Sequence, residues 1–354
     1  MCLVTFDWEH NDAVEKFKKY REQKSASWSV VELTNSCNFN CEWCYASAGY
    51  NYRPEHMSKE KALELVKILA DAGIKQITCS GGEPTLYPHL NSFIEACKDY
   101  GIITHINTNG YLLTKKLALE LKKAGLSQVQ TNIDSLTPSE HDRVRGKKGS
   151  FERAKKAIKN SMEAGMTVVS QTVLTRNNEN EVIDIIKFVR TMGVQRIRVW
   201  DMTGEGYAKG RMKFVPTNYV ESLRRIAQFA EMNRAKNVES CDPLFPLDFE
   251  TRLTSSGMGC VAVRGLLIHI SVKGDVFYCA THRKSLYNLF EVSKNRDIKN
   301  FHKEKVEEFV SSIKLPEKCV KCEFFDRCKG GCNTRRNFSD DNLDYFCPFG
   351  NRHD

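Results

Sequence analysis

Between residues 28 and about 214, the chain repeats one pattern of apolar and polar positions. A short run of β-branched and apolar residues leads into a polar loop, and then into a segment whose apolar residues recur every three or four positions. The first part of this unit predicts a buried strand, and the last part predicts an amphipathic helix. A glycine closes each helix, as is common where helices end in a left-handed conformation. These glycines are Gly73, Gly101, Gly125, Gly165 and Gly193.

Six strands and the helices between them follow from this pattern. The strands are predicted at residues 30–34, 74–79, 102–107, 126–133, 166–174 and 194–200. Helix starts are predicted at Ser58, Thr114 and Ser150, because hydroxyl side chains favour the N-cap position. Continuous apolar strands that alternate with helices are typical of parallel sheets. We therefore expect an α/β fold, a partial (β/α)6 TIM-like barrel, with functional groups in the loops that follow the strands.

The pattern changes after residue 215. A further helix is predicted from about 216 to 237, and beyond it short strands, glycines and clustered cysteines replace the repeated unit. We therefore expect an N-terminal extension at 1–27, the partial barrel at 28–215, a linking helix and connector at 216–255, and a small Cys-rich domain at 256–354.

The composition of the chain limits the cellular compartment and the classes of partner that are expected. Fourteen cysteines in 354 residues, with no secretory signal peptide ahead of them, indicate metal ligation in a reducing, cytoplasmic setting rather than a disulfide framework. No apolar run approaches the roughly 20 residues that span a bilayer, so no membrane partner is expected. The net charge of +9 suits an acidic partner, but the basic residues are spread over helix faces without interleaved aromatic residues. Nucleic acid is therefore not expected.

Three cysteines lie in the loop that follows the first predicted strand. Cys37, Cys41 and Cys44 form a C-x3-C-x2-C motif. Three thiolates on one short loop can bind three irons of a cubane cluster and leave the fourth iron without a protein ligand. The alternatives are a zinc knuckle or three unrelated buried cysteines. Structural zinc takes four ligands, and only the distant His56 could serve as the fourth, so an iron–sulfur cluster is the better interpretation.

Short polar motifs follow the next three strands. They are Gly81-Gly82-Glu83-Pro84, Thr108-Asn109-Gly110 and Asn132-Ile133-Asp134-Ser135. With the three cysteines, and with Trp43 just before the third, this series resembles the radical S-adenosylmethionine (SAM) superfamily. The resemblance implies that Cys37, Cys41 and Cys44 hold a [4Fe–4S] cluster, whose electron cleaves SAM to a 5′-deoxyadenosyl radical. It also implies that SAM binds at Trp43, Gly81, Gly82, Glu83 and Asn132, the last standing where many relatives carry serine.

Seven cysteines form a second motif in the C-terminal third. Their pattern is C…G-x4-C…C-x2-C-x5-C-x3-C…C, and it resembles the SPASM domain found in radical SAM enzymes that mature peptides and some cofactors. The resemblance implies two auxiliary [4Fe–4S] clusters. The first would use Cys260, Cys279 and Cys332, and the second Cys319, Cys322, Cys328 and Cys347. A zinc ribbon is the alternative, and it leaves most of these cysteines unexplained.

Four cysteines lie outside both motifs. Either Cys241 supplies the fourth ligand of the first auxiliary cluster, or one iron of that cluster has no cysteine ligand. Cys2, Cys79 and Cys97 are expected to be ordinary small apolar residues or free thiols. Ala280 follows Cys279 where sulfatase maturases carry an aspartate as general base, so that sub-family is not expected, and no general base is identified.

The leading functional interpretation is radical oxidation or crosslinking of a residue in a peptide or protein. The alternatives are a small carboxylated molecule, such as a tetrapyrrole of an alternative haem pathway or a sugar, and a non-catalytic iron–sulfur electron carrier or sensor. A flavodoxin or ferredoxin-type electron donor is expected as a partner. About 27 residues precede the first strand, too few for a fused peptide-recognition domain, so any leader-peptide-binding protein would be separate.

Overall fold

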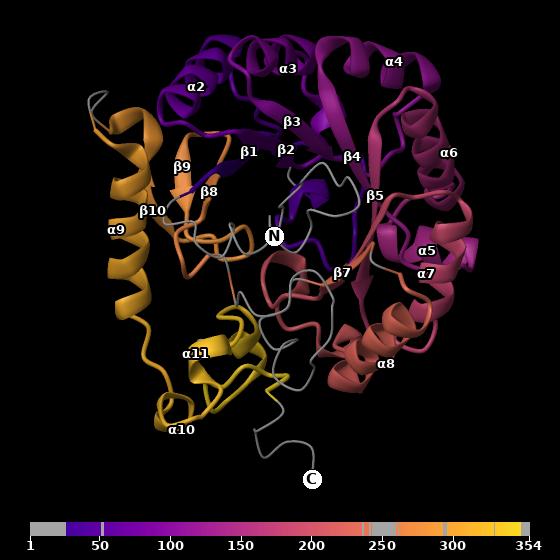
Figure 1. Cartoon of the computed structure of the whole chain (residues 1–354), viewed down its shortest axis with the longest axis vertical. Coiled ribbons are helices and arrows are strands. Elements are labelled where there is room, and N and C mark those ends of the chain that lie inside the picture. Colours follow the sequence, from indigo (N-terminus) through magenta and orange to yellow (C-terminus); the bar gives the residue numbers. More distant parts are fainter. Residues whose placement is uncertain are drawn as a thin grey trace.

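A computed structural model describes residues 26–50, 53–235, 237–240, 242, 260, 262–292, 296–328 and 330–347. One curved sheet frames this part of the chain, with the strand order β10-β9-β8-β1-β2-β3-β4-β5-β6-β7 (Figure 1). The strands are β1 Trp28–Thr34, β2 Gln76–Gly81, β3 Ile103–Asn107, β4 Leu126–Asn132, β5 Thr167–Leu174, β6 Arg196–Asp201, β7 Val238–Ser240, β8 Leu267–Ile270, β9 Asp275–Phe277 and β10 Ser285–Asn288.

Strands β1 to β6 confirm the six predicted strands. Each pairs in parallel with the next, and β7 continues the series beside β6. Parallel neighbours need a crossover, which helices on the outer face supply (Figure 1). The sheet curves around an interior and forms the expected partial barrel. The carboxyl ends of its strands therefore lie together at one end of the barrel.

The helices of the barrel begin and end close to the predicted positions. They are α2 Lys59–Asp71, α3 Leu90–Asp99, α4 Lys115–Ala124, α5 Pro138–Arg145, α6 Ser150–Glu163, α7 Val182–Thr191 and α8 Tyr219–Met232. The predicted N-caps of α2 and α4 are confirmed. The Ser58 hydroxyl accepts a hydrogen bond from the Lys61 N–H at 3.3 Å, and the Thr114 hydroxyl accepts one from the Leu117 N–H at 3.2 Å.

The prediction that Ser150 caps a helix was wrong by one residue. Ser150 is the first residue of α6, and Gly149 is the N-cap with φ +77°. The Asp142 carboxylate accepts hydrogen bonds from the Gly149 N–H at 2.5 Å, the Ser150 hydroxyl at 2.9 Å and the Phe151 N–H at 2.9 Å. The Asp142 carboxylate of α5 therefore accepts the hydrogen bonds of the free N–H groups at the start of α6, so a serine hydroxyl is not needed there.

Two apolar cores lie between the sheet and its helices. The first packs β1 to β4 against α2, α3 and α4, and the second packs β5 and β6 against α6, α7 and α8. In α7 the buried residues Val182, Ile185, Ile186 and Val189 follow helical spacing. Cys79 and Cys97 are fully buried in the first core, which confirms that they are ordinary core residues.

Polar side chains of β4, β6 and β7 form a buried network. Arg196 Nε donates to Glu239 Oε1 at 2.6 Å, and Arg198 Nη2 donates to Glu239 Oε2 at 3.0 Å. Arg198 Nη1 also donates to Gln130 Oε1 at 2.5 Å. Burying these charges is tolerable only because they are paired. Because these groups are paired with one another, we expect functional groups at the carboxyl ends of the strands instead.

The C-terminal part of the chain extends the same sheet. β8 pairs in parallel with β1, while β9 and β10 add antiparallel strands beyond it. The helices here are α9 Ile298–Ser311, α10 Glu317–Val320 and α11 Phe325–Cys328. In Figure 1, α9 flanks β9 and β10, and the gold segment with α10 and α11 lies at the open side of the barrel. Within the described ranges, no helix is long and apolar enough to cross a membrane.

Candidate functional site

Cys37, Cys41 and Cys44 lie in the loop after β1, at the carboxyl ends of the strands, and all three are half-buried. The Cys44 N–H donates to the Cys41 carbonyl at 3.3 Å, which forms a turn between two of the cysteines. The Glu42 N–H donates to the Val144 carbonyl of α5 at 3.0 Å. Backbone hydrogen bonds therefore hold this cysteine loop in one conformation.

The Gly81-Gly82 turn after β2 packs directly on the cysteine loop. The Gly82 N–H donates to the Thr34 carbonyl at 2.8 Å, and the Glu83 N–H donates to the Ser36 carbonyl at 2.7 Å. A Cβ atom on Gly82 would lie 2.0 Å from the Ser36 oxygen, and one on Gly81 would lie 2.2 Å from the Thr34 oxygen. Gly81 also has φ +113°. Only glycine fits at these positions, so the turn sets the spacing between Glu83 and the cysteines.

Glu83 is a buried hub between the loops after β2 and β3, with 1% of its surface exposed. Its carboxylate accepts hydrogen bonds from the Thr85 N–H at 3.1 Å, the Thr85 hydroxyl at 2.6 Å, the Thr108 hydroxyl at 2.6 Å and the Asn109 N–H at 2.7 Å. Asn109 Nδ2 in turn donates to Asn38 Oδ1, beside Cys37, at 2.7 Å. Glu83 is therefore held rigidly, with its negative charge near the cysteine loop.

Burial is the main reason why the pKa values of the Cys37 and Cys41 thiols are high. It raises the pKa of Cys37 to about 12, with a further contribution from the Glu83 charge. It raises the pKa of Cys41 to about 11, although the Arg145 charge opposes the shift. Without metal these thiols are protonated at neutral pH, and a metal must displace the protons because the thiolate is the ligand. The loop suits cationic iron better than it suits a free nucleophilic cysteine.

Arg145 is a cation beside the cysteine loop that the sequence analysis did not single out. Its Nη1 donates to Asp134 Oδ2 at 3.2 Å, and its carbonyl oxygen lies 3.6 Å from Cys41 Sγ. Burial opposes the charge, but Cys41 and Asp134 outweigh it and raise the pKa of Arg145 above its usual value. One signal was present in the sequence. A carboxylate directly after a buried strand needs a cationic partner, and Arg145 follows Asp134 by eleven residues.

The two other residues predicted to bind SAM lie in different surroundings. Asn132 ends β4 at the edge where the cysteine loop lies, and its register partner is Gln171 of β5. Trp43 is 7% exposed, and its ring packs edge-to-face on Phe214 with 5.7 Å between the centroids. Trp43 is thus also part of the apolar core. Contact of either residue with SAM stays a prediction.

Three C-terminal cysteines approach one another between β9 and the segment after α11. Cys279 Sγ lies 3.3 Å from the Thr281 hydroxyl, and Cys332 Sγ lies 3.2 Å from the Thr334 hydroxyl. The two hydroxyl groups are 3.5 Å apart. Cys260 packs in the same small apolar cluster as Cys279. The set predicted for the first auxiliary cluster therefore gathers in one place.

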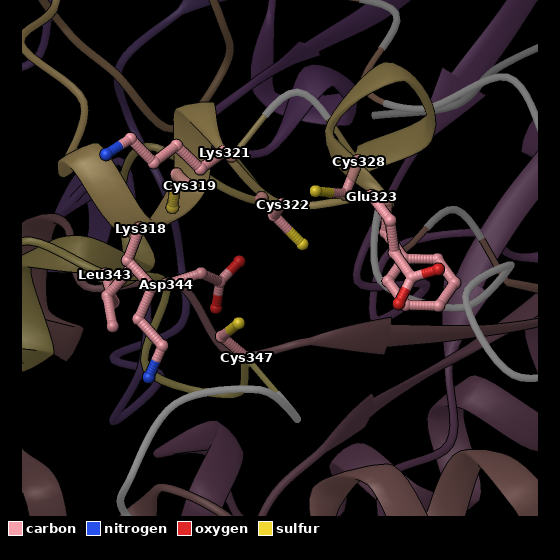
Figure 2. Close-up of a pocket in the computed structure, with 12 residues that line it drawn as sticks. Lys318, Cys319, Lys321, Cys322, Glu323, Cys328, Leu343, Asp344 and Cys347 are labelled. Atoms are coloured by element: carbon pink, nitrogen blue, oxygen red, sulfur yellow. The ribbon is translucent and has the colours of Figure 1, made fainter.

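The other four C-terminal cysteines line one pocket of about 390 Å³. In Figure 2 the sulfur atoms of Cys319, Cys322, Cys328 and Cys347 surround a common space, and the Asp344 carboxylate also faces it. The volume is more than ten times the ~30 Å³ share of a water molecule, so the pocket has room for a group of several atoms. Four thiols are the usual donor set of an iron–sulfur cluster. The lining therefore fits the group that the sequence predicted.

The cysteines of the described residues are all thiols, and none of them forms a disulfide. In the same ranges, no three His, Cys, Asp or Glu side chains form a group that could hold a single metal ion. Cys2 and Cys241 lie outside the described residues, so a contribution of Cys241 to the first auxiliary cluster stays a prediction.

A buried ionic group connects both C-terminal cysteine sets to the barrel. Arg335 is fully buried and pairs with Asp201 of β6 at 3.3 Å, with Asp344 at 2.7 Å and with Asp242. Asp344 also accepts a hydrogen bond from the Cys332 N–H at 2.6 Å. Burial raises the pKa of Asp201 to about 7; Arg335 opposes this shift, and the two other carboxylates add to it. We call these residues the Arg335 node.

A second buried ion pair connects the C-terminal part to β1. Arg283, in the loop after Cys279, donates from Nη2 to Glu32 Oε2 at 2.9 Å and from Nη1 to Glu32 Oε1. His269 of β8 lies 2.9 Å from the same carboxylate. Burial alone would raise the pKa of Glu32, but His269 and Arg283 outweigh it and lower the pKa to about 2. The strand that leads into the cysteine loop is thus tied to the loop that carries Cys279.

Comparison with known proteins identifies the family of this chain. Residues 31–189 match the radical SAM superfamily. GTP 3′,8-cyclase of Helicobacter pylori strain HPAG1 is 33% identical over 226 residues, which cover 62% of this chain and 68% of that protein. AdoMet-dependent heme synthase of Oleidesulfovibrio alaskensis is 25% identical over 324 residues, 86% of this chain and 81% of that protein.

A solved structure extends the likeness in fold to the C-terminal part. Streptococcus suis SuiB, in a crystal structure with its precursor peptide SuiA, superposes with a TM-score of 0.70 at 20% identity. The superposition covers 94% of this chain and 77% of SuiB. The family match runs from β1 into α7 and therefore contains the cysteine loop, Glu83 and Arg145. The chain belongs to the radical SAM superfamily of enzymes.

Proposed function

We propose that this enzyme reductively cleaves SAM to a 5′-deoxyadenosyl radical and uses it to oxidise or crosslink a residue of a peptide or protein. One observation carries the proposal. A loop of three thiols, a buried carboxylate and a half-buried cation meet at the carboxyl ends of β1 to β4. An electron carrier or sensor would need the thiols, but it would not need opposite charges beside them.

Those opposite charges suit the methionine part of SAM, which carries an amino group and a carboxylate. We assign the amino group to Glu83 and the carboxylate to Arg145, since charge-assisted hydrogen bonds to both ends fix the orientation of a zwitterion. Asn132 offers an amide at the end of β4. Cys37, Cys41 and Cys44 would hold the [4Fe–4S] cluster, which supplies one electron to the sulfonium group of SAM.

The C-terminal cysteines support a SPASM-type domain with two auxiliary [4Fe–4S] clusters. Cys260, Cys279 and Cys332 form one gathered set, and the four cysteines of the pocket form the other. Clusters there would supply an acceptor for the electron that a substrate radical must lose during oxidation. The Arg335 node lies between the two sets and the barrel, and it would keep their distance to the radical site constant.

Peptide is the first substrate candidate, because SuiB, which shares this fold over 94% of the chain, was solved with a precursor peptide. A carboxylated tetrapyrrole is the second candidate, and one observation favours it. The likeness to the heme synthase covers 86% of the chain and so reaches beyond the barrel, whereas the likeness to the GTP cyclase covers 62%.

Anaerobic turnover tests the proposal. Protein reconstituted with iron and sulfide is reduced by dithionite and mixed with SAM, and 5′-deoxyadenosine is measured by chromatography. We expect product from the wild type and a clear loss in Glu83→Gln, with weaker SAM binding and unchanged iron. Peptides encoded beside the gene and a carboxylated tetrapyrrole are then added separately, and mass spectrometry identifies the one that is modified. Absence of 5′-deoxyadenosine from folded, iron-replete wild type would contradict the proposal.

A further inference from the structure

A basic and partly apolar surface lies directly outside the cysteine loop. It comprises Tyr111 and Leu112 after β3, Lys147 and Lys148 between α5 and α6, and Arg153 on α6. Leu112 is 37% exposed, Lys148 and Arg153 are exposed, and Tyr111 and Lys147 are half-buried. We call these five residues the basic patch. It combines two apolar or aromatic side chains with three cationic ones.

Aromatic contacts attach the basic patch to the cysteine loop. Lys147 Nζ and the Arg153 guanidinium each lie 5.2 Å from the centroid of the Tyr111 ring. Tyr111 packs edge-to-face on Phe39, a residue of the cysteine loop, with 5.7 Å between the centroids. Cation–π contacts and an aromatic pair of this kind hold side chains in defined positions. The patch is therefore built onto the loop and is more than a chance group of lysines.

Two short routes lead from the basic patch to the thiols. The Tyr111 N–H donates to Asn109 Oδ1 at 2.9 Å, and Asn109 Nδ2 lies 4.0 Å from Cys37 Sγ. On the other side, the carbonyl of Arg145, two residues before Lys147, lies 3.6 Å from Cys41 Sγ. A molecule seated on the patch would thus be separated from the cluster ligands by a single layer of residues.

The positive charge of the basic patch is not compensated locally. Among the described residues, no carboxylate lies within ion-pair distance of Lys147, Lys148 or Arg153. The nearest acids in the sequence are engaged elsewhere. Asp142 caps α6 through three hydrogen bonds, and Glu152 pairs with Lys155 at 2.9 Å. The patch therefore presents three positive charges to a partner.

The surface at the second C-terminal cysteine set differs in charge. Lys321 there pairs with Glu317 at 2.5 Å, and the same pocket is lined by Glu323 and Asp344. In Figure 2 the Asp344 carboxylate lies among the sulfur atoms, and Glu323 lies on the opposite side of the view from Lys318 and Lys321. Charges of both signs make this surface a poor match for a strongly acidic partner.

We infer that the basic patch is the docking surface for an acidic one-electron carrier protein of the flavodoxin or ferredoxin class. The inference rests on the proposed function, which requires an external electron for the cluster on Cys37, Cys41 and Cys44. In the transfer the carrier is oxidised by one electron and the cluster is reduced by one, and no bond or proton moves. A small surface that combines apolar and cationic side chains is suited to the weak, fast complexes that electron carriers form.

Reversing charge on the patch tests the inference. The variant is Lys147→Glu/Arg153→Glu, and the matched control is Lys59→Glu/Lys67→Glu, which changes the same charge on exposed positions of α2. Figure 1 shows α2 at the upper left, away from α6 at the right. Binding of oxidised flavodoxin to the reconstituted enzyme is measured by calorimetry at low salt. We expect affinity to fall about tenfold or more in the patch variant and less than about twofold in the control, because docking charges act within about one Debye length.

Turnover with two reductants separates docking from chemistry. With dithionite, the wild type and both variants are expected to form 5′-deoxyadenosine at equal rates, since neither Lys147 nor Arg153 touches SAM in the proposed site. With reduced flavodoxin, only the patch variant is expected to slow, about tenfold, and the wild-type rate is expected to fall as salt rises.

Three results overturn the inference. The first is that the patch variant binds flavodoxin as tightly as the wild type does. The second is that the patch variant slows as much with dithionite as with reduced flavodoxin. The third is that the patch variant loses affinity for an acidic peptide but keeps its affinity for flavodoxin. A wild type that makes no 5′-deoxyadenosine with dithionite refutes the proposed function instead, and in that case the calorimetric result still decides whether the patch binds flavodoxin.

Discussion

The barrel and the C-terminal part both gather cysteines, but they position them by different means. In the barrel, main-chain hydrogen bonds and the Gly81-Gly82 turn hold the cysteine loop at the end of a parallel sheet. In the C-terminal part, the helices near the cysteines, α10 and α11, have four residues each. Their place depends on side-chain contacts such as the Arg335 node. Main-chain turns occur at the cysteines of both regions, but the C-terminal sites are joined to the barrel by buried side-chain ion pairs, whereas main-chain hydrogen bonds join the cysteine loop to its neighbours in the barrel.

The largest expected effect is loss of SAM cleavage when the barrel thiols are removed. In Cys37→Ala/Cys41→Ala/Cys44→Ala, 5′-deoxyadenosine is expected to fall below detection, because the cluster loses all its protein ligands. Circular dichroism is expected to match wild type, since the backbone holds this loop. Iron is expected to fall by about one [4Fe–4S] cluster while the C-terminal iron remains. If this variant formed as much 5′-deoxyadenosine as the wild type, the cysteine loop would not be needed for SAM cleavage.

The next effect separates the two regions through the Arg335 node. Arg335→Ala leaves Asp201, Asp242 and Asp344 buried without their cation, which typically costs about 3–5 kcal/mol. We expect a lower urea midpoint and loss of C-terminal iron, with the barrel cluster retained. Lys187→Ala is the control, because Lys187 pairs with Asp184 on the surface, where such pairs contribute about 1 kcal/mol or less. Equal effects of the two substitutions would contradict the comparison.

A smaller effect concerns the ion pair that joins the regions. Glu32→Gln is expected to cost about 2–3 kcal/mol of unfolding free energy, since Arg283 and His269 lose a charged acceptor. The pKa of Glu32 is lowered from 4.5 to about 2 in the folded state, so its contribution is present above pH 4.5 and is lost as the pH falls toward 2. Urea unfolding of the metal-free protein at several pH values checks this. The gap between wild type and variant is expected to narrow below pH 4.5; a constant gap would count against the ion pair.

The smallest effect distinguishes a crowded glycine from an uncrowded one. Gly81→Ala and Gly101→Ala both force a positive φ on alanine, at a cost of about 1–3 kcal/mol. The new Cβ of the first would lie 2.2 Å from the Thr34 oxygen, whereas the second meets nothing within 4 Å. We expect only Gly81→Ala to weaken SAM binding, measured by calorimetry. Equal SAM affinity in both variants would show that the Gly81-Gly82 turn does not determine the geometry of the SAM site.

Much of the barrel could be predicted from the sequence, because its signals are local. Apolar runs and closing glycines located the six strands, and short motifs at their ends located Cys37, Glu83 and Asn132. The cysteine spacing also grouped the C-terminal thiols as the structure places them. The cap of α6 was missed because its acceptor, Asp142, belongs to the preceding helix.

The ionic contacts could not be predicted, since their partners lie far apart in the chain. Glu32 and Arg283 are separated by 251 residues, and Asp242 and Arg335 by 93. No pattern of spacing predicts such pairs, and they are defined only once β8 lies beside β1 and the C-terminal segment closes the open side of the barrel. Arg145 is the exception, because its partner Asp134 was already in a motif.

Iron and sulfide analysis with Mössbauer spectroscopy tests the central claim, that both regions hold clusters, most directly. Fully reconstituted wild type is expected to contain about twelve irons per chain, all as [4Fe–4S] clusters, from four irons in each of three sites. A protein that holds only about four irons after careful anaerobic reconstitution would show that the C-terminal cysteines bind no cluster, and the comparison between the two regions would then fail.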